Sequence, residues 1–263
     1  MLLPGSALKG YAIEASDGRI GTVSDFLFDD TTWKLRWMVV DTGTWLTGRK
    51  VLIHPSAISR VNYEQQELPV YLTRAQVKDS PDIAQDAPVS RQMQDNLYGY
   101  YGWDPLWGGG NYFGGYSGLA GPPMALPSFQ QDAELLERPL LDQPLPGLLP
   151  EEGDPHLRSI NEVTGYHVHA TDGRIGHIEN VLMDDAAWGI RYLIVNTRDW
   201  WFGRHVLVSP FAVREVSWSE HEVRTDLTRS QVKASPPWDP ATAINRAYEE
   251  RLHGYYGWPG YSW

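Results

Sequence analysis

Two pairs of adjacent aspartates, Asp29-Asp30 and Asp184-Asp185, are the residues whose type and spacing best suit a hard cation. Calcium takes carboxylate and carbonyl oxygens as ligands, but the residues around both pairs lack the regularly spaced acidic ligands of a calcium loop. Aspartate is also a favoured turn residue. We therefore expect both pairs to form strand-to-strand turns and to bind no metal.

Three histidines form the next candidate cluster. His167 and His169 share one face of a strand by period two, and His177 follows across a predicted hairpin. Such a cluster suits zinc. A related segment earlier in the chain has no histidine at these positions, so we expect surface histidines and keep a small-ligand or metal binder as an alternative.

No catalytic constellation is present in the sequence. It has no glycine-rich phosphate loop before a helix, no nucleophile motif and no cysteine. The repeated carboxylates belong to predicted turns. We therefore expect a protein that is not an enzyme, with no catalytic residues and no cofactor.

The charge distribution separates two nearly neutral blocks from an acidic middle. The net charge is −11, and residues 84–155 hold 2 Lys/Arg against 10 Asp/Glu. Nucleic-acid binders usually carry a basic patch, so nucleic-acid binding is not expected. No stretch approaches the roughly 20 apolar residues that span a bilayer, and the N-terminal residues do not read as a signal peptide. We expect a protein of the cytoplasm, with peripheral membrane association left open.

An internal repeat organises the chain. GYAIEASDGRIG from Gly10 recurs as GYHVHATDGRIG from Gly165, an offset of 155 that holds without a gap. Over residues 10–81, 32 of 72 positions are identical to residues 165–236. We call residues 1–103 and 156–263 the first and second repeats.

The identical positions fall where a β fold needs them. Asp17-Gly18 and Asp172-Gly173 predict type I′ hairpins, which need positive φ at two residues. Apolar strands follow at 35–40 and 190–195, and short ones at 51–53 and 206–208. Short strands with regular turn signals predict a small barrel. Capping boxes then predict a helical turn, starting at Thr73 and Thr228.

An amphipathic helix is predicted after each β domain. Val89, Met93 and Leu97 are spaced by four, and so are the apolar residues 155 positions later. In the second repeat, Asp239-Pro240 predicts the helix start. Gly99 and Gly254 are expected to end the helices in the left-handed conformation.

Two aromatic surfaces are candidate contact sites. Each helix ends in the string GYYGW, whose aromatic residues either pack internally or form a binding face: Tyr100, Tyr101, Trp103, Tyr255, Tyr256 and Trp258. We favour internal packing for these helix-end clamps. Two loop tips are expected to contact a partner or to cover a barrel end: Trp45, Leu46, Arg49, Trp200, Trp201, Phe202 and Arg204.

The predicted organisation has five parts. They are a barrel at 1–83, a helix and clamp at 84–103, an acidic Gly/Pro-rich linker at 104–155, a barrel at 156–238, and a helix and clamp at 239–263. The predicted class is mainly β, with two small barrels related by duplication.

The pattern resembles the PRC-barrel family at residues 8–80 and 163–235. The DG-R-IG hairpin, the strand ending in an Asp pair, the L/I-R-W/Y strand, the GRKVLIHPSAI segment and the LTRAQV turn carry this resemblance. It implies small barrels like the cytoplasmic domain of the photosynthetic reaction centre H subunit and the C-terminal domain of a bacterial ribosome maturation factor. The H subunit's membrane anchor and the ribosome factor's preceding domain are not expected here.

The combined interpretation is a non-catalytic scaffold or adaptor that binds a protein partner. We expect the two repeats to pack as an intrachain pseudo-dimer, with homo-oligomers left open. The alternatives are a peripheral part of a photosynthetic electron-transfer system, a ribosome-assembly factor, and the small-ligand or metal binder.

Overall fold

The computed structural model describes residues 1–80, 91–103, 154, 156–197, 204–240 and 242–260. The predicted linker, residues 104–155, therefore lies outside the described residues apart from Asp154. The elements of the first repeat are β1 (Leu2–Pro4), η1 (Gly5–Leu8), β2 (Ala12–Ala15), β3 (Gly18–Asp29), β4 (Leu35–Asp41), β5 (Lys50–Ile53), η2 (Pro55–Ala57), β6 (Glu67–Pro69), α1 (Arg74–Lys78) and α2 (Arg91–Tyr101).

The second repeat follows the same order. Its elements are β7 (Leu157–Ser159), α3 (Ile160–Val163), β8 (His167–Ala170), β9 (Gly173–Asp184), β10 (Gly189–Asn196), β11 (His205–Val208), η4 (Pro210–Ala212), β12 (Val213–Ser217), β13 (Glu222–Thr225), α4 (Arg229–Ala234) and α5 (Arg246–Tyr256). All but β10 and β12 start 155 residues after an element of the first repeat.

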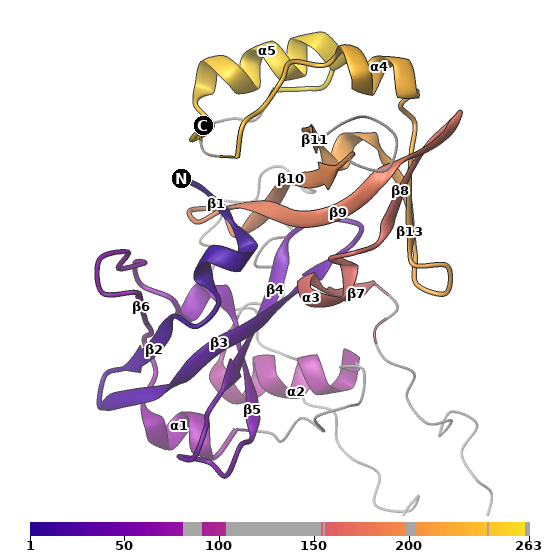
Figure 1. Ribbon diagram of the computed structural model, residues 1–263. Coiled ribbons are helices and arrows are strands. Elements are labelled where there is room, and N and C mark those ends of the chain that lie inside the picture. Colours follow the sequence, from indigo (N-terminus) through magenta and orange to yellow (C-terminus); the bar gives the residue numbers. More distant parts are fainter. Residues whose placement is uncertain (81–90, 104–153, 155, 198–203, 241, 261–263) are drawn as a thin grey trace, which may run out of the picture.

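The strands form two sheets, one in each repeat (Figure 1). Their orders are β5-β4-β3-β2-β6 and β11-β10-β9-β8-β13-β12. The predicted mainly β class is confirmed. In the part of the chain that is described, the end strands of a sheet are not hydrogen-bonded to each other, so each curled sheet stops short of a closed barrel.

The two repeats exchange their first strands. Strand β1 pairs with β9, with Leu3 opposite Met183, and β7 pairs with β3, with Arg158 opposite Phe28. Each sheet is therefore extended by a strand of the other repeat (Figure 1). The exchange is reciprocal because β1 and β7 occupy equivalent positions, 155 residues apart.

A short bridge joins the repeats between the two exchanged strands. The Leu35 backbone N–H donates to the Trp188 carbonyl at 2.8 Å, and the Ile190 N–H donates to the Trp33 carbonyl at 2.8 Å. The rings of Phe26 and Trp188, one from each repeat, have centroids 6.4 Å apart. One cluster of buried apolar side chains runs through both repeats, so they share a core.

Each capping box forms as predicted. The Thr73 and Thr228 side chains accept from the backbone N–H of Gln76 and Gln231, and the glutamine side chains reach back to the cap residues. These short helices hold the end of each β domain against the hairpin before β3 or β9.

The predicted type I′ turns at Asp-Gly are wrong. Ala15 pairs directly with Gly18, so the two-residue turn is Ser16-Asp17, and positive φ is found at Gly18 but not at Asp17. The Asp17 carboxylate instead accepts from the Arg74 backbone N–H at 2.7 Å, which satisfies a free donor in the first turn of α1. Asp172 does the same for Arg229 at 2.7 Å.

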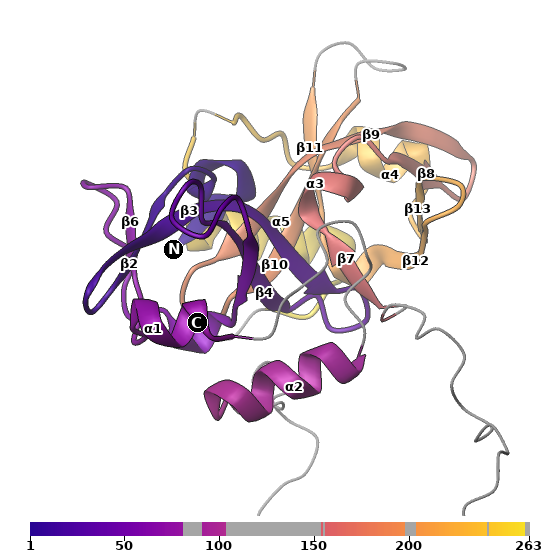
Figure 2. The same cartoon turned by 90° about the horizontal axis from the view of Figure 1, so that it is seen from below.

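Helices α2 and α5 pack on the outer faces of their own sheets, at opposite ends of the molecule (Figure 1). The view from below has α2 in front (Figure 2). Leu97 and Leu252 are each 1% exposed at these contacts. No described helix is long and apolar enough to cross a membrane.

The predicted helix boundaries need two corrections. Helix α5 starts at Arg246 behind the N-cap Asn245, whose side chain accepts from the Tyr248 N–H, rather than at Asp239-Pro240. Gly257 ends it with φ 73°, and Gly102 has φ 67° at the end of α2. The second glycine of GYYGW is therefore the terminator, while Gly99 and Gly254 lie inside the helices.

Candidate binding groove between the repeats

The helix-end clamps lie against their own repeats. Tyr101 stacks on Trp103 with ring centroids 4.1 Å apart, and Tyr256 stacks on Trp258 at 4.2 Å. These four rings are half-buried and pack on the apolar core.

The outer tyrosines of the clamps tie each long helix to the short helix of its repeat. The Tyr100 hydroxyl donates to the Gln76 carbonyl at 3.0 Å, and the Tyr255 hydroxyl donates to the Gln231 carbonyl at 2.9 Å. Their rings stay about two-fifths exposed, so a partner contact there remains a prediction.

The first loop tip folds back on the barrel. Trp45 and Leu46 are half-buried against the core, and the Arg74 guanidinium lies 4.6 Å from the Trp45 ring centroid. Arg49 donates to the carbonyls of Lys78 and Ser80 at 3.0 and 2.5 Å. Of the second tip, Arg204 is exposed. Trp200, Trp201 and Phe202 lie outside the described residues.

The aspartate pairs form turns and inter-repeat contacts. The Asp29 side chain accepts from the backbone of Thr31 and Thr32 at 3.0 and 2.8 Å. Burial raises the pKa of Asp29, but these hydrogen bonds outweigh it and leave the pKa below its ordinary value. Asp30 contacts His156 at 2.9 Å and Arg158 at 2.7 Å in the other repeat.

The histidine cluster is held by strand pairing and by a carboxylate. His167 lies opposite His177 in the ladder, and His169 Nε2 is 3.2 Å from Glu222. Among the described residues, no group of three or more His, Cys, Asp or Glu side chains is placed to hold a metal ion.

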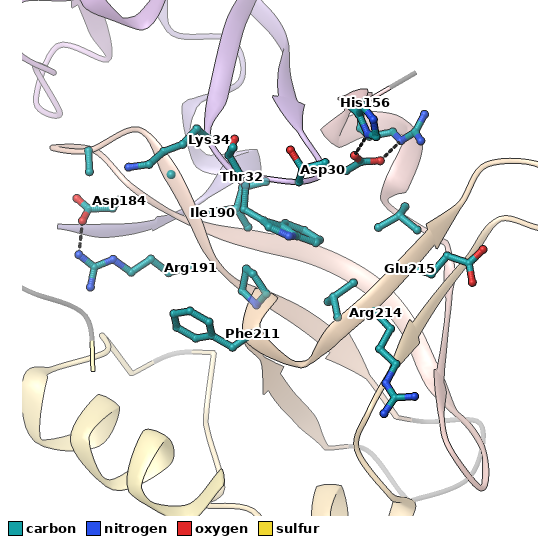
Figure 3. A pocket seen from close by; sticks show the side chains of 18 residues that line it. Asp30, Thr32, Lys34, His156, Asp184, Ile190, Arg191, Phe211, Arg214 and Glu215 are labelled. Carbon is teal, nitrogen blue, oxygen red and sulfur yellow. Dashed lines mark hydrogen bonds and ion pairs between the residues drawn. The ribbon is translucent and has the colours of Figure 1, made fainter. Parts of the chain in front are cut away.

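A groove of about 770 Å³ lies where the repeats meet (Figure 3). The turn between β3 and β4 forms one wall, and η4 with β12 forms the other. Its larger apolar lining residues are Trp33, Ile190, Pro210, Phe211, Val213 and Val216.

Local structure fixes the two aromatic rings of the groove. Trp33 has φ 57° in the turn that Asp29 caps, and its ring stacks on buried Phe28 at 5.4 Å. The Ser209 hydroxyl accepts from the Phe211 N–H at 3.4 Å and starts η4. The Phe211 side chain is left 47% exposed.

The acidic side chains of the groove are paired with cations. Asp30 is paired with Arg158 and His156, and Asp184 with Arg191 at 2.5 Å. Burial raises the pKa of Asp184, but hydrogen bonds from the Ala186 N–H and from Arg191 outweigh it and hold the pKa below its ordinary value. Asp184 is therefore ionised at neutral pH and neutralises Arg191.

Two cations of the groove have no such partner. Within the described residues, Lys34 and Arg214 take part in no ion pair, whereas Glu215 is 4.0 Å from Arg224. The groove thus combines exposed aromatic surface with a local excess of positive charge, in a chain of net charge −11.

Lys34, Phe211 and Arg214 were missed from sequence because they are not repeated, although Trp33, Pro210 and Val216 of the same groove are. Phe211 and Arg214 occupy the positions where the first repeat has Ser56 and Ser59. Identity between the repeats therefore does not point to these two residues. The signal in the sequence that identifies Phe211 and Arg214 is the difference in side-chain chemistry between equivalent positions of the two repeats.

A cluster of titratable side chains lies under α5, next to the groove. The Tyr192 hydroxyl donates to Glu249 at 2.9 Å and contacts His253 Nε2 at 2.7 Å, and Arg191 is 3.7 Å from Glu249. In the first repeat, Trp37, Gln94 and Tyr98 stand in place of Tyr192, Glu249 and His253, and only Arg191 keeps its counterpart, Arg36.

This cluster predicts a specific pH dependence. Burial raises the pKa of Glu249, although Tyr192 and Arg191 oppose it. A carboxyl with a raised folded-state pKa contributes stability that falls as pH rises from its ordinary value of 4.5 through the folded value. We expect Glu249→Gln, in urea unfolding, to be more stable relative to the wild type at pH 8 than at pH 5.

The matched control is Glu250→Gln on the same helix, because Glu250 is exposed and pairs with Arg246. Burial lowers the pKa of His253, so that histidine opposes folding as pH falls, but it is present in both proteins and cancels in the difference. An equal difference at both pH values for Glu249→Gln would contradict the prediction.

Comparison with known proteins finds one family match, and it lies within the first repeat. Residues 3–75 match the family model of the PRC-barrel domain. An uncharacterised protein of Deinococcus radiodurans is 36% identical over 80 residues, covering 29% of this chain and 27% of that protein. The chain thus spans well under half the length of this relative.

The predicted resemblance is confirmed for the first repeat, and the second copy stays a prediction. A PRC-barrel domain indicates, in general terms, a role in protein interaction or scaffolding.

Proposed function

We propose that this chain is a non-catalytic scaffold of two tandem PRC-barrel repeats that binds a protein partner in the groove between them, in the cytoplasm. The observation that carries the proposal is the inter-repeat groove, which is lined by exposed Phe211 and by two cations, Lys34 and Arg214, that form no ion pair with the residues the structure describes. Aromatic residues, phenylalanine included, and arginine are enriched at protein interfaces.

The second repeat contributes to this proposal through its equivalent elements. The same order of strands and the same capping boxes support a second PRC-like domain at 163–235. Two domains that exchange strands hold the walls of the groove in a fixed relation, which lowers the entropy cost of binding.

Affinity purification from a native lysate of the source organism tests the proposal. We expect the wild-type chain to retain a partner that the double variant Phe211→Ala, Arg214→Ala loses. Tyr71→Ala is the control, since Tyr71 is 75% exposed and does not line the groove. Retention of every partner by the double variant would exclude the groove as the interface, and an empty wild-type sample would argue against a scaffold.

A further inference from the structure

A second cavity lies at the position equivalent to the groove. Its volume is about 580 Å³, and most of its lining residues are 155 positions from a lining residue of the groove: Met1, Pro55, Ser56, Ile58, Ser59, Arg60, Val61, Asp185, Ala186 and Trp188. The duplication has therefore produced two equivalent cavities, one at each exchanged strand.

The two cavities differ in chemistry. Where the groove has Phe211 and Arg214, the second cavity has Ser56 and Ser59, and Gly189 is the counterpart of Lys34. In the second cavity the Tyr63 hydroxyl and the Met1 amino group both bind Asp185. The chain's own groups thus bind an aspartate in both cavities, since Asp30 of the groove pairs with His156 and Arg158. The groove differs in having the cations Lys34 and Arg214 and the exposed Phe211, where the second cavity has Arg60 and Tyr63.

The shape of the groove suits an extended chain. Four consecutive residues of β12, Val213 to Val216, line it. The register of β12 against β13 shifts between Val213 and Glu215, so this part of the strand is bulged, and side chains on both sides of the bulge line the groove. Strand β12 is the last strand of its sheet, and within the described residues its outer edge is in no ladder. Such edges bind peptides by strand addition.

The charges select the side chains of that peptide. Lys34 and Arg214 come from different repeats and lie on opposite sides of the groove (Figure 3). Phe211 and Trp33 add apolar surface to its lining. Carboxylates on the ligand would pair with the cations, and an apolar side chain would cover the exposed ring.

We propose that the groove binds one extended acidic peptide segment per chain, with carboxylate side chains directed to Lys34 and Arg214 and an apolar side chain on Phe211. This inference rests on the proposed function and specifies the chemistry of the partner.

Fluorescence anisotropy with two labelled probes tests the inference. One probe is an eight-residue peptide of alternating leucine and aspartate, and the other has lysine in place of aspartate. We expect the acidic probe to bind with a stoichiometry of one and to weaken with added salt. The double variant Lys34→Gln, Arg214→Gln should lose about tenfold in affinity, because it removes both cations that pair with the peptide carboxylates.

The control variant is Arg60→Gln, which removes a cation from the second cavity. Equal binding of the acidic and basic probes, two peptides per chain, or an equal loss in Arg60→Gln would each overturn the inference. A partner that is captured from lysate through Phe211 but is insensitive to Lys34→Gln, Arg214→Gln would overturn it while leaving the proposed function intact. Binding of the acidic probe without any partner captured from lysate would support the inference and contradict the proposed function.

Discussion

Replacing Trp37 with alanine is expected to lower the free energy of unfolding by about 3–5 kcal/mol, as for other buried Trp→Ala changes. The Trp37 side chain is 0% exposed and fills the contact between β4 and helix α2. Its indole N–H donates to Gln94 at 3.0 Å, and its ring lies 5.1 Å from the Tyr98 ring. Removing it opens a cavity and leaves the buried Gln94 side chain without this donor.

Urea unfolding followed by far-UV circular dichroism measures the change. We also expect hydrogen exchange in α2 to quicken more than in α5, because α5 packs on the second repeat, which does not contain Trp37. Tyr71→Ala is the matched control, and its cost should stay within about 0.5 kcal/mol, as for exposed positions. A loss below about 1 kcal/mol in Trp37→Ala would show that α2 contributes little to the packing of the first repeat.

The second large effect is expected at Gly176, where alanine should cost about 3 kcal/mol or more through steric overlap and backbone strain. A Cβ there would lie 2.0 Å from the Asn196 carbonyl oxygen, and the residue has φ 149°. Gly21, its counterpart, would meet the Asp41 carbonyl at 2.1 Å. Both crowding atoms belong to the backbone of a paired strand, so they move only if β9 and β10, or β3 and β4, separate.

The matched control for Gly176→Ala is Gly254→Ala. Gly254 lies inside α5 with nothing within 4 Å of an added Cβ, so alanine should stabilise the chain by about 1 kcal/mol through helix propensity. Thermal unfolding of the two variants is then expected to shift in opposite directions. A shift in the same direction would contradict the steric account.

Local structure could be predicted from the sequence where a few neighbouring residues determine it. The capping boxes at Thr73 and Thr228 form because donor and acceptor are three residues apart. The prediction of a type I′ turn at Asp17-Gly18 was wrong because the Asp17 carboxylate accepts a hydrogen bond from the first turn of α1, 57 residues further along the chain. The predicted start of α5 at Asp239-Pro240 was wrong because Asn245, an equally good N-cap residue, lies closer to the buried apolar residues of the helix.

The groove and the strand exchange were beyond sequence reasoning for a different reason. Strands β1 and β7 are three residues long, too short to show a period, and their partner strands belong to the other repeat. The groove combines Trp33 and Lys34 with Phe211 and Arg214, which become neighbours only once that exchange has placed the repeats together.

The exchanged strands also set the order of events during synthesis. Leu3 pairs with Met183, so β1 leaves the ribosome on the order of ten seconds before its partner, at about 5–20 residues per second. The free edge of β3 likewise waits for β7. An unpaired strand edge is a template for wrong pairing with other chains. The nascent first repeat is therefore most vulnerable to aggregation while the second is still being translated, and slow translation between them prolongs that exposure.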